Sequence, residues 1–136
     1  YTSHMFEHLS KAKAERFLRE AYRVLCPGGI IRIVVPSLDI RIERYLKDRD
    51  ADRFVASLAM AMPDLDGISA KLKFMLVGGR DHRWMYNGTS LCALLGKCGF
   101  ERAAELPAGE TMIRNPEPLD LNAAADDSLY VEAQKP

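Results

Sequence analysis

From residue 20 to residue 36 the chain reads EAYRVLCPGGIIRIVVP. Its first part completes an amphipathic helical pattern, because apolar residues recur at three- and four-residue steps from Ser10 to Leu25. Pro27 cannot continue a helix, and the two glycines after it permit a tight reversal. The run from Ile30 to Val35 is rich in β-branched residues with almost no polar alternation, which is typical of a strand covered on both faces. This stretch therefore predicts a helix, a short turn and a buried strand.

The residues before this stretch supply the rest of a βαβ unit. Such a unit needs a first strand parallel to the second, and that strand is whatever ends at residues 1–4. These residues look like the tail of a strand that has been cut. The chain also starts at Tyr1 without an initiator methionine, so we expect it to be a piece of a longer protein.

Residues 37–77 carry a helical insertion after the buried strand. Apolar residues recur there at helical spacing in three groups. The groups are residues 38–46, 54–62 and 68–76, with Pro63 between the last two. Two interpretations stay open: a small satellite helical core, or a lid over a site.

The carboxyl end predicts one more helix and two strands. Residues 90–99 form a helical pattern that Gly99 stops, and residues 100–106 are a strand candidate. The sequence NPEP at residues 115–118 indicates a loop. Residues 128–133 alternate between apolar and other side chains, so we expect a strand with one more exposed face.

Composition and charge narrow the class of protein. The chain has 136 residues, of which 48% are hydrophobic, and 19 basic residues balance 19 acidic ones. This length and hydrophobic content fit one domain over residues 1–136. The balanced charge gives no electrostatic footprint for nucleic acid or an anionic membrane. No apolar run approaches the roughly 20 residues of a membrane-spanning helix. Cys26, Cys92 and Cys98 form no C-x-x-C pair, and no signal peptide is recognisable, so we expect a reducing, cytoplasmic setting.

His4, Glu7 and His8 match H-x-x-E-H, the inverted zinc-peptidase signature. On a helix, histidines four residues apart project to one face and can share a Zn²⁺ ion, with Glu7 placed to polarise a bound water. A third ligand would have to come from downstream, where no carboxylate sits in a recognisable context. A zinc-dependent hydrolase that uses these three residues is thus an alternative, and the favoured interpretation assigns no metal site.

Two motifs resemble class I S-adenosylmethionine-dependent methyltransferases of the type 11-like group. The helix end EAYRVLCPGG at residues 20–29, with the strand that closes in VP at residues 35–36, resembles the segment between the fourth and fifth strands of that family. Upstream, SHMFEHL at residues 3–9 resembles the S-H-x-x-E-H-L that follows the fourth strand. Both motifs occur in the family's order and spacing. With lower specificity, the likeness extends to HRWMY at residues 82–86 and to residues 128–133.

The resemblance implies an α/β fold with part of a Rossmann-like methyltransferase sheet. We expect strand, helix and strand, then the helical insertion, then a final antiparallel pair of strands at the edge of the sheet. The implied cofactor is S-adenosylmethionine, which the family binds with a glycine-rich turn and with an acidic residue at the end of a strand. The sequence has no G-x-G-x-G. The chain therefore resembles the carboxyl-terminal half of a methyltransferase domain, and whether it binds the cofactor alone stays open.

The resemblance also places candidate site residues at the end of the fourth strand. Tyr1, Thr2, Ser3 and His4 would face the cofactor's methionine side and the transferring methyl group, since α/β sheets place ligands at strand carboxyl ends. Methyl transfer from a sulfonium is an in-line displacement, so the enzyme aligns the nucleophile and removes its proton. His4 is the candidate catalytic base, because an imidazole titrates near neutral pH. Ordinary loop contacts are the alternative role for these four residues.

The candidate residues for substrate binding are His82, Arg83, Trp84 and Tyr86. Arg83 could meet an anionic group, and Trp84 could supply a stacking face. The aromatic rings could equally dock the helical insertion, which is the commoner use of large aromatic residues.

We therefore expect a domain derived from an S-adenosylmethionine-dependent methyltransferase, whose methyl acceptor the sequence does not reveal. The alternative from another class is a non-catalytic α/β module. A sheet without its first strands leaves a hydrophobic strand at its edge, and such an edge invites pairing. We expect a homodimer or pairing through this exposed strand, and no membrane or nucleic-acid partner.

Overall fold

The computed structural model describes residues 1–60, 81–117 and 119–136 of the chain. Both helices and strands occur in these residues, which confirms the expected α/β class. The elements in chain order are β1 (Thr2–Ser3), the 3-10 helix η1 (Phe6–His8), α1 (Lys11–Val24), β2 (Ile30–Pro36), α2 (Leu38–Asp48), α3 (Ala51–Ser57), α5 (Gly88–Lys97), β3 (Glu101–Leu106) and β4 (Ser128–Gln134). The predicted helix, turn and strand of residues 10–36 and the last helix and two strands are all present.

The described strands form one sheet in the order β1-β2-β4-β3. β1 runs parallel to β2, with Thr2 opposite Ile33, which confirms the expected strand at the amino end. β4 runs antiparallel to both β2 and β3. The expected antiparallel final pair is therefore present, with β3 at the edge and β4 inside the sheet.

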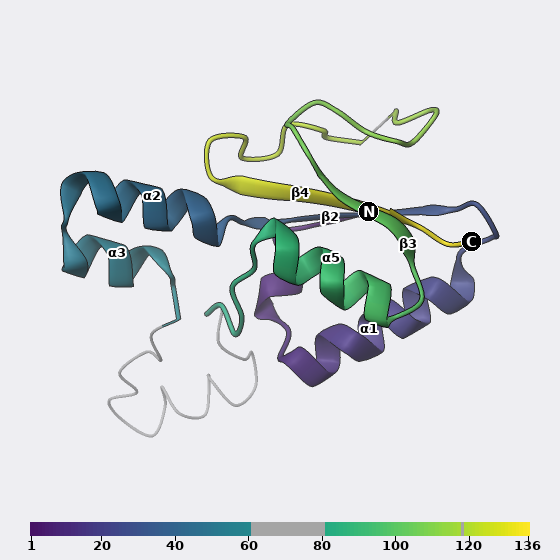
Figure 1. The fold of residues 1–136 in the computed structure, drawn as a ribbon, viewed down its shortest axis with the longest axis horizontal. Coiled ribbons are helices and arrows are strands. Elements are labelled where there is room, and N and C mark those ends of the chain that lie inside the picture. The colour runs from purple at the N-terminus through teal and green to yellow at the C-terminus, as the bar shows by residue number, and fades with distance from the viewer. Residues whose placement is uncertain (61–80, 118) are drawn as a thin grey trace, which may run out of the picture.

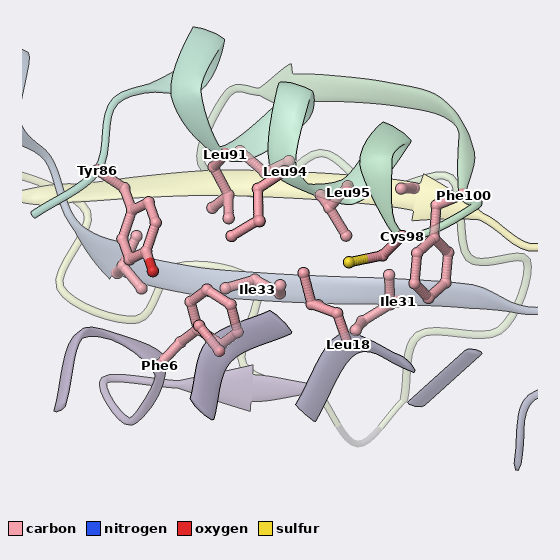
Figure 2. Packing of buried hydrophobic residues seen from close by; sticks show 14 of the residues in the cluster. Phe6, Leu18, Ile31, Ile33, Tyr86, Leu91, Leu94, Leu95, Cys98 and Phe100 are labelled. Atoms are coloured by element: carbon pink, nitrogen blue, oxygen red, sulfur yellow. The ribbon is translucent and has the colours of Figure 1, made fainter. Parts of the chain in front are cut away.

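One hydrophobic core lies between the sheet and the helices α1 and α5, which cover the same face of the sheet (Figure 1). Figure 2 shows Leu91 and Leu95 of α5 facing Phe6 and Leu18 from the other side of the core, with Ile33 of β2 between them. All five side chains are fully buried. The apolar faces that the helical periodicity of the sequence predicts are therefore the faces of both helices that pack in the core.

The opposite face of the sheet is covered by the long connection between β3 and β4 (Figure 1). This overturns the prediction that the last strand has an exposed face, because Tyr130 and Glu132 are as buried as their apolar neighbours. The hydroxyl of Tyr130 donates to the carbonyl oxygen of Ala123 at 2.8 Å. A carboxylate oxygen of Glu132 accepts from the backbone N–H of Met112 at 2.6 Å. Polar side chains on this face thus form hydrogen bonds with the connection.

Helices α2 and α3 continue from the end of β2 and lie beyond the sheet (Figure 1). Arg41 of α2 donates to Asp127, just before β4, at 2.8 Å, and to the carbonyl oxygen of Ser57 at 2.8 Å. The first predicted helix of the insertion is present as α2, and the second, predicted over residues 54–62, overlaps α3 at Ala51–Ser57. The third, predicted over residues 68–76, lies outside the described residues.

Candidate functional site

The carboxyl ends of the two parallel strands meet at one edge of the sheet, where α/β proteins place their ligands. The backbone N–H of His4, directly after β1, donates to the carbonyl oxygen of Val34 in β2 at 2.9 Å. Ser128, the first residue of β4, lies opposite the last residue of β2 at this edge. We call the side chains gathered there the strand-end cluster: it consists of His4, Glu7, His8, His82 and Ser128.

His4 adopts a left-handed backbone conformation with a φ of 50°, which is uncommon for a residue with a Cβ atom. Its Nε2 lies 3.2 Å from the Ser128 hydroxyl oxygen, and its Nδ1 lies 3.6 Å from Oε1 of Glu7. The carboxylate favours a proton on Nδ1, which leaves Nε2 as the basic nitrogen. The His4 side chain is 38% exposed, so a ligand can reach it.

Glu7 is the buried acid of the cluster, with a side chain that is 1% exposed. Its Oε1 lies between two imidazoles, 3.6 Å from His4 Nδ1 and 3.8 Å from His8 Nε2. Its Oε2 has no hydrogen-bond partner among the described residues. A buried carboxylate oxygen without a partner is costly and calls for an explanation.

His8 and His82 lie side by side, with ring centroids 5.2 Å apart. His8 Nδ1 is 3.2 Å from the carbonyl oxygen of Asp81, and His82 Nδ1 is 2.9 Å from that of Leu58. Burial lowers the pKa of His82, and the charge of Glu7 opposes this shift. The shift favours the neutral imidazole, whose free nitrogen is a ligand or an acceptor.

The residues predicted to bind substrate are divided between the surface and the core. The backbone N–H groups of Arg83 and Trp84 donate to the carbonyl oxygen of Glu7 at 2.8 and 3.1 Å, which fixes this segment against η1. Trp84 is 40% exposed, and the ammonium of Lys11 lies 4.9 Å from its ring centroid. Tyr86 is buried against Phe6.

The hydroxyl of Tyr86 has no partner among the described residues. Burial, followed by the nearby charge of Glu7, raises the pKa of Tyr86 to about 12. The phenol therefore stays neutral at physiological pH. Its position indicates that it packs the core beneath the cluster.

The residues predicted to bind the cofactor form β1 and the position after it. Thr2 is buried, Ser3 is partly exposed, and Tyr1 is about half exposed. The hydroxyl of Tyr1 donates to the carbonyl oxygen of Asp120 at 2.9 Å. Of the four predicted residues, Ser3 and His4 therefore offer accessible polar groups at the strand end.

Sequence reasoning paired His4 and His8 with Glu7 but did not find His82 or Ser128 as their neighbours. His82 is 74 residues from His8, and only tertiary contacts bring them together. In the sequence, the only indication of a role for His82 is the HRWMY motif at residues 82–86, which contains it. Ser128 carries no local signal, because it was predicted only as a strand residue.

A separate hollow of about 630 Å³ lies at the other end of β2, far along the strand from the cluster. Gly28 and Ile30 line it, together with Arg102 and Arg114. It contains none of the predicted site residues. Among the helices that the structure describes, none has the length and apolar character needed to cross a membrane.

Comparison with known proteins finds a family match at the amino end of the chain. Residues 1–33 match the family model of the methyltransferase domain. This segment contains β1, η1, α1 and the first part of β2, and its match supports a class I S-adenosylmethionine-dependent methyltransferase-like domain. The four-stranded sheet with its helices is consistent with a partial Rossmann-like methyltransferase fold. No curated protein matches the chain.

Among solved structures, the chain is similar to a possible exported protein from Bordetella parapertussis, with 16% sequence identity and a TM-score of 0.49. The similarity covers 99% of this chain and 37% of that protein. The chain thus spans well under half the length of that protein.

Proposed function

We propose that this chain forms the acceptor side of an S-adenosylmethionine-dependent methyltransferase, with the strand-end cluster beside the methyl group that is transferred. The match of residues 1–33 to the methyltransferase domain carries this proposal. The matched segment holds His4, Glu7 and His8, and it ends in β2, the strand that pairs with β1.

The described residues fit one end of the cofactor. Ser3 and His4 are accessible at the carboxyl end of β1, which suits the methyl-donating end. The glycine-rich turn that would hold the cofactor's polar ends is absent from the sequence. When bound, S-adenosylmethionine supplies an electrophilic methyl group on a sulfonium. The residues of this chain would align the acceptor and take up its proton.

His4 is the proposed proton acceptor. Glu7 lies on its Nδ1 side at 3.6 Å, and the Ser128 hydroxyl lies 3.2 Å from Nε2. A carboxylate beside Nδ1 orients the ring and stabilises the imidazolium that forms. The Nε2 atom would take the proton of an acceptor hydroxyl or amine placed at the open end of the cluster.

Arg83 and Trp84, which follow His82 in the chain, would form the rim of this proposed site. The guanidinium of Arg83 would meet an anionic group of the acceptor. The partly exposed ring of Trp84 would stack on an apolar or aromatic part of the acceptor, next to the ammonium of Lys11. Tyr86 would support this rim from the core.

All three cysteines are free, which supports a reducing, cytoplasmic setting for the reaction.

Calorimetric titration of the chain with S-adenosylmethionine and S-adenosylhomocysteine tests this proposal. We expect a dissociation constant near or below about 100 μM, equivalent to about 5.5 kcal/mol. The variant Ser3→Tyr should abolish binding, because its ring fills the strand end. The matched control Val55→Tyr adds the same ring on exposed α3 and should bind as the parent does. A folded chain that binds neither ligand would overturn the proposal for this chain.

Methyl transfer from isotopically labelled S-adenosylmethionine to a panel of hydroxyl and amine acceptors tests the role of His4. For any acceptor that is methylated, His4→Ala should lower the rate about 10²- to 10⁴-fold, the usual contribution of a general base. Full activity in His4→Ala would remove this residue from the mechanism.

A further inference from the structure

We propose that Glu7, His8 and His82 form a three-ligand site for a divalent transition metal ion, with Zn²⁺ as the ion that the ligand set fits best. The three side chains offer one carboxylate oxygen and two imidazole nitrogens, and these atoms all lie within 4.8 Å of one another. Two histidines and one glutamate are an established zinc set, in which the fourth position is left to water. The site does not depend on the proposed methyl transfer.

Both imidazoles are held in the tautomer that a metal requires. His8 Nδ1 faces the carbonyl oxygen of Asp81 at 3.2 Å, and His82 Nδ1 faces that of Leu58 at 2.9 Å. A carbonyl oxygen can only accept a hydrogen bond, so the proton resides on Nδ1 of each ring. In the neutral form of each ring, the free lone pair is therefore on Nε2. Metal-binding histidines usually have such a partner on their second nitrogen, which fixes the orientation of the ring.

The buried carboxylate of Glu7 also points to a bound cation, independently of the two histidines. It is 1% exposed, and its Oε2 has no partner among the described residues. Leaving such an oxygen unpaired carries the desolvation penalty of a buried polar group without a hydrogen bond. A metal ion bound to this carboxylate would offset its negative charge in the low-dielectric surroundings.

The backbone holds the two halves of the site together. The carbonyl oxygen of Glu7 accepts from the N–H groups of Arg83 and Trp84, and the N–H of His82 donates to the carbonyl oxygen of Ala59 at 2.8 Å. Glu7 Oε1 is 3.8 Å from His8 Nε2, whereas ligand atoms around a tetrahedral zinc lie roughly 3.3 Å apart. Side-chain rotations would have to bring the three ligand atoms, which lie within 4.8 Å of one another, to that spacing when the metal binds.

His4 lies outside the ligand set. Its Nε2 is at hydrogen-bond distance from the Ser128 hydroxyl, 3.2 Å away. The H-x-x-E-H spacing of the sequence therefore supplies two ligands, and the third comes from His82 rather than from His4. This makes His4→Ala a matched control, because it removes an imidazole beside Glu7 and leaves the three ligands in place.

The test is metal binding by the full chain with Cys26→Ser, which removes the exposed thiol. After treatment with a chelator, Zn²⁺ is titrated by calorimetry, and Co²⁺ is titrated by visible absorption to report the coordination geometry. We expect one ion per chain and a tetrahedral Co²⁺ spectrum. His8→Ala and His82→Ala should each weaken binding by more than about 100-fold, which exceeds the loss from removing an outer-shell partner. His4→Ala should bind as the parent does.

Circular dichroism and urea unfolding without metal would show whether each variant folds. His82→Gln gives a second test, because it keeps a polar side chain near Leu58 and still removes the imidazole ligand. The proposal is overturned if the parent binds less than one ion per chain, or if folded His8 and His82 variants bind Zn²⁺ as tightly as the parent. It is also overturned if His4→Ala loses as much affinity as His8→Ala.

Discussion

At the residue scale, the conformation of His4 sets the geometry of the strand-end cluster. Its φ of 50° is in the left-handed region, where a Cβ atom costs roughly 1–2 kcal/mol. The structure keeps a strained residue at the point where the strand ends and the polar side chains converge. Strain of this kind occurs preferentially at functional sites, where surrounding contacts hold it in place.

This strain gives a prediction that separates backbone from side chain. Glycine has no Cβ atom, so His4→Gly should be more stable than His4→Ala by about 1 kcal/mol, although both lack the imidazole. Urea unfolding of the two variants measures the difference. Equal stabilities, or a more stable alanine variant, would show that the left-handed conformation of His4 is not maintained in solution.

The three cysteines should differ in reactivity. Burial raises the pKa of Cys92 and of Cys98, so less of each is thiolate at neutral pH, whereas Cys26 is exposed. Iodoacetamide at pH 7.5 should therefore modify Cys26 at least about tenfold faster than the other two. Mass spectrometry of peptides over time gives the three rates. In urea they should converge, and uniform rates in the folded chain would contradict the described packing.

At the element scale, a buried ion pair fixes the β3–β4 connection on the sheet. Arg32 of β2 and Glu132 of β4 are both fully buried, with Nη1 and Oε1 2.7 Å apart. Arg32 also donates to the carbonyl oxygens of Glu110 at 2.8 Å and Leu121 at 3.1 Å. The pair therefore joins two strands to the segment that covers them.

Removal of one partner should be costly, because it leaves the other charge buried and unpaired. Arg32→Met should destabilise the fold by about 3–5 kcal/mol, and the double variant Arg32→Met with Glu132→Leu should recover most of that loss. Urea unfolding of the parent, both single variants and the double variant completes the cycle. A loss below about 1 kcal/mol in Arg32→Met would mean that water reaches Glu132.

The same elements show how far local sequence determines this fold. The helix, turn and strand of residues 10–36 could be predicted, because their periodicity and the Pro27 stop signal are local. The exposed face predicted for residues 128–133 was wrong, since alternation cannot reveal that a distant connection covers the polar side. Glu132 looks like a surface residue until Arg32 is placed opposite it. His82 likewise joins Glu7 and His8 only through tertiary contacts.

At the scale of the whole molecule, β1 is the terminal strand of the described sheet and has apolar surface beside it. Tyr1 is 49% exposed and Val24 is 65% exposed. Both line a hollow of about 170 Å³ together with Phe17, Ala21 and Ile31. The outer backbone groups of a terminal strand can pair with another chain. Strand pairing and apolar burial would therefore act at the same place.

This arrangement predicts that the chain associates with itself or with another strand through the β1 edge. Sedimentation velocity over a range of concentrations should show self-association that Val24→Lys weakens, because a lysine there places charge in the apolar contact. A lysine at the last residue of α1 also suits the negative end of the helix dipole, so the fold should be preserved. Val55→Lys changes an equally exposed valine, 61% exposed, on the distant α3 and is the matched control. A chain that stays monomeric at every concentration, or that responds equally to both lysines, would place the contact elsewhere or show that β1 needs no partner.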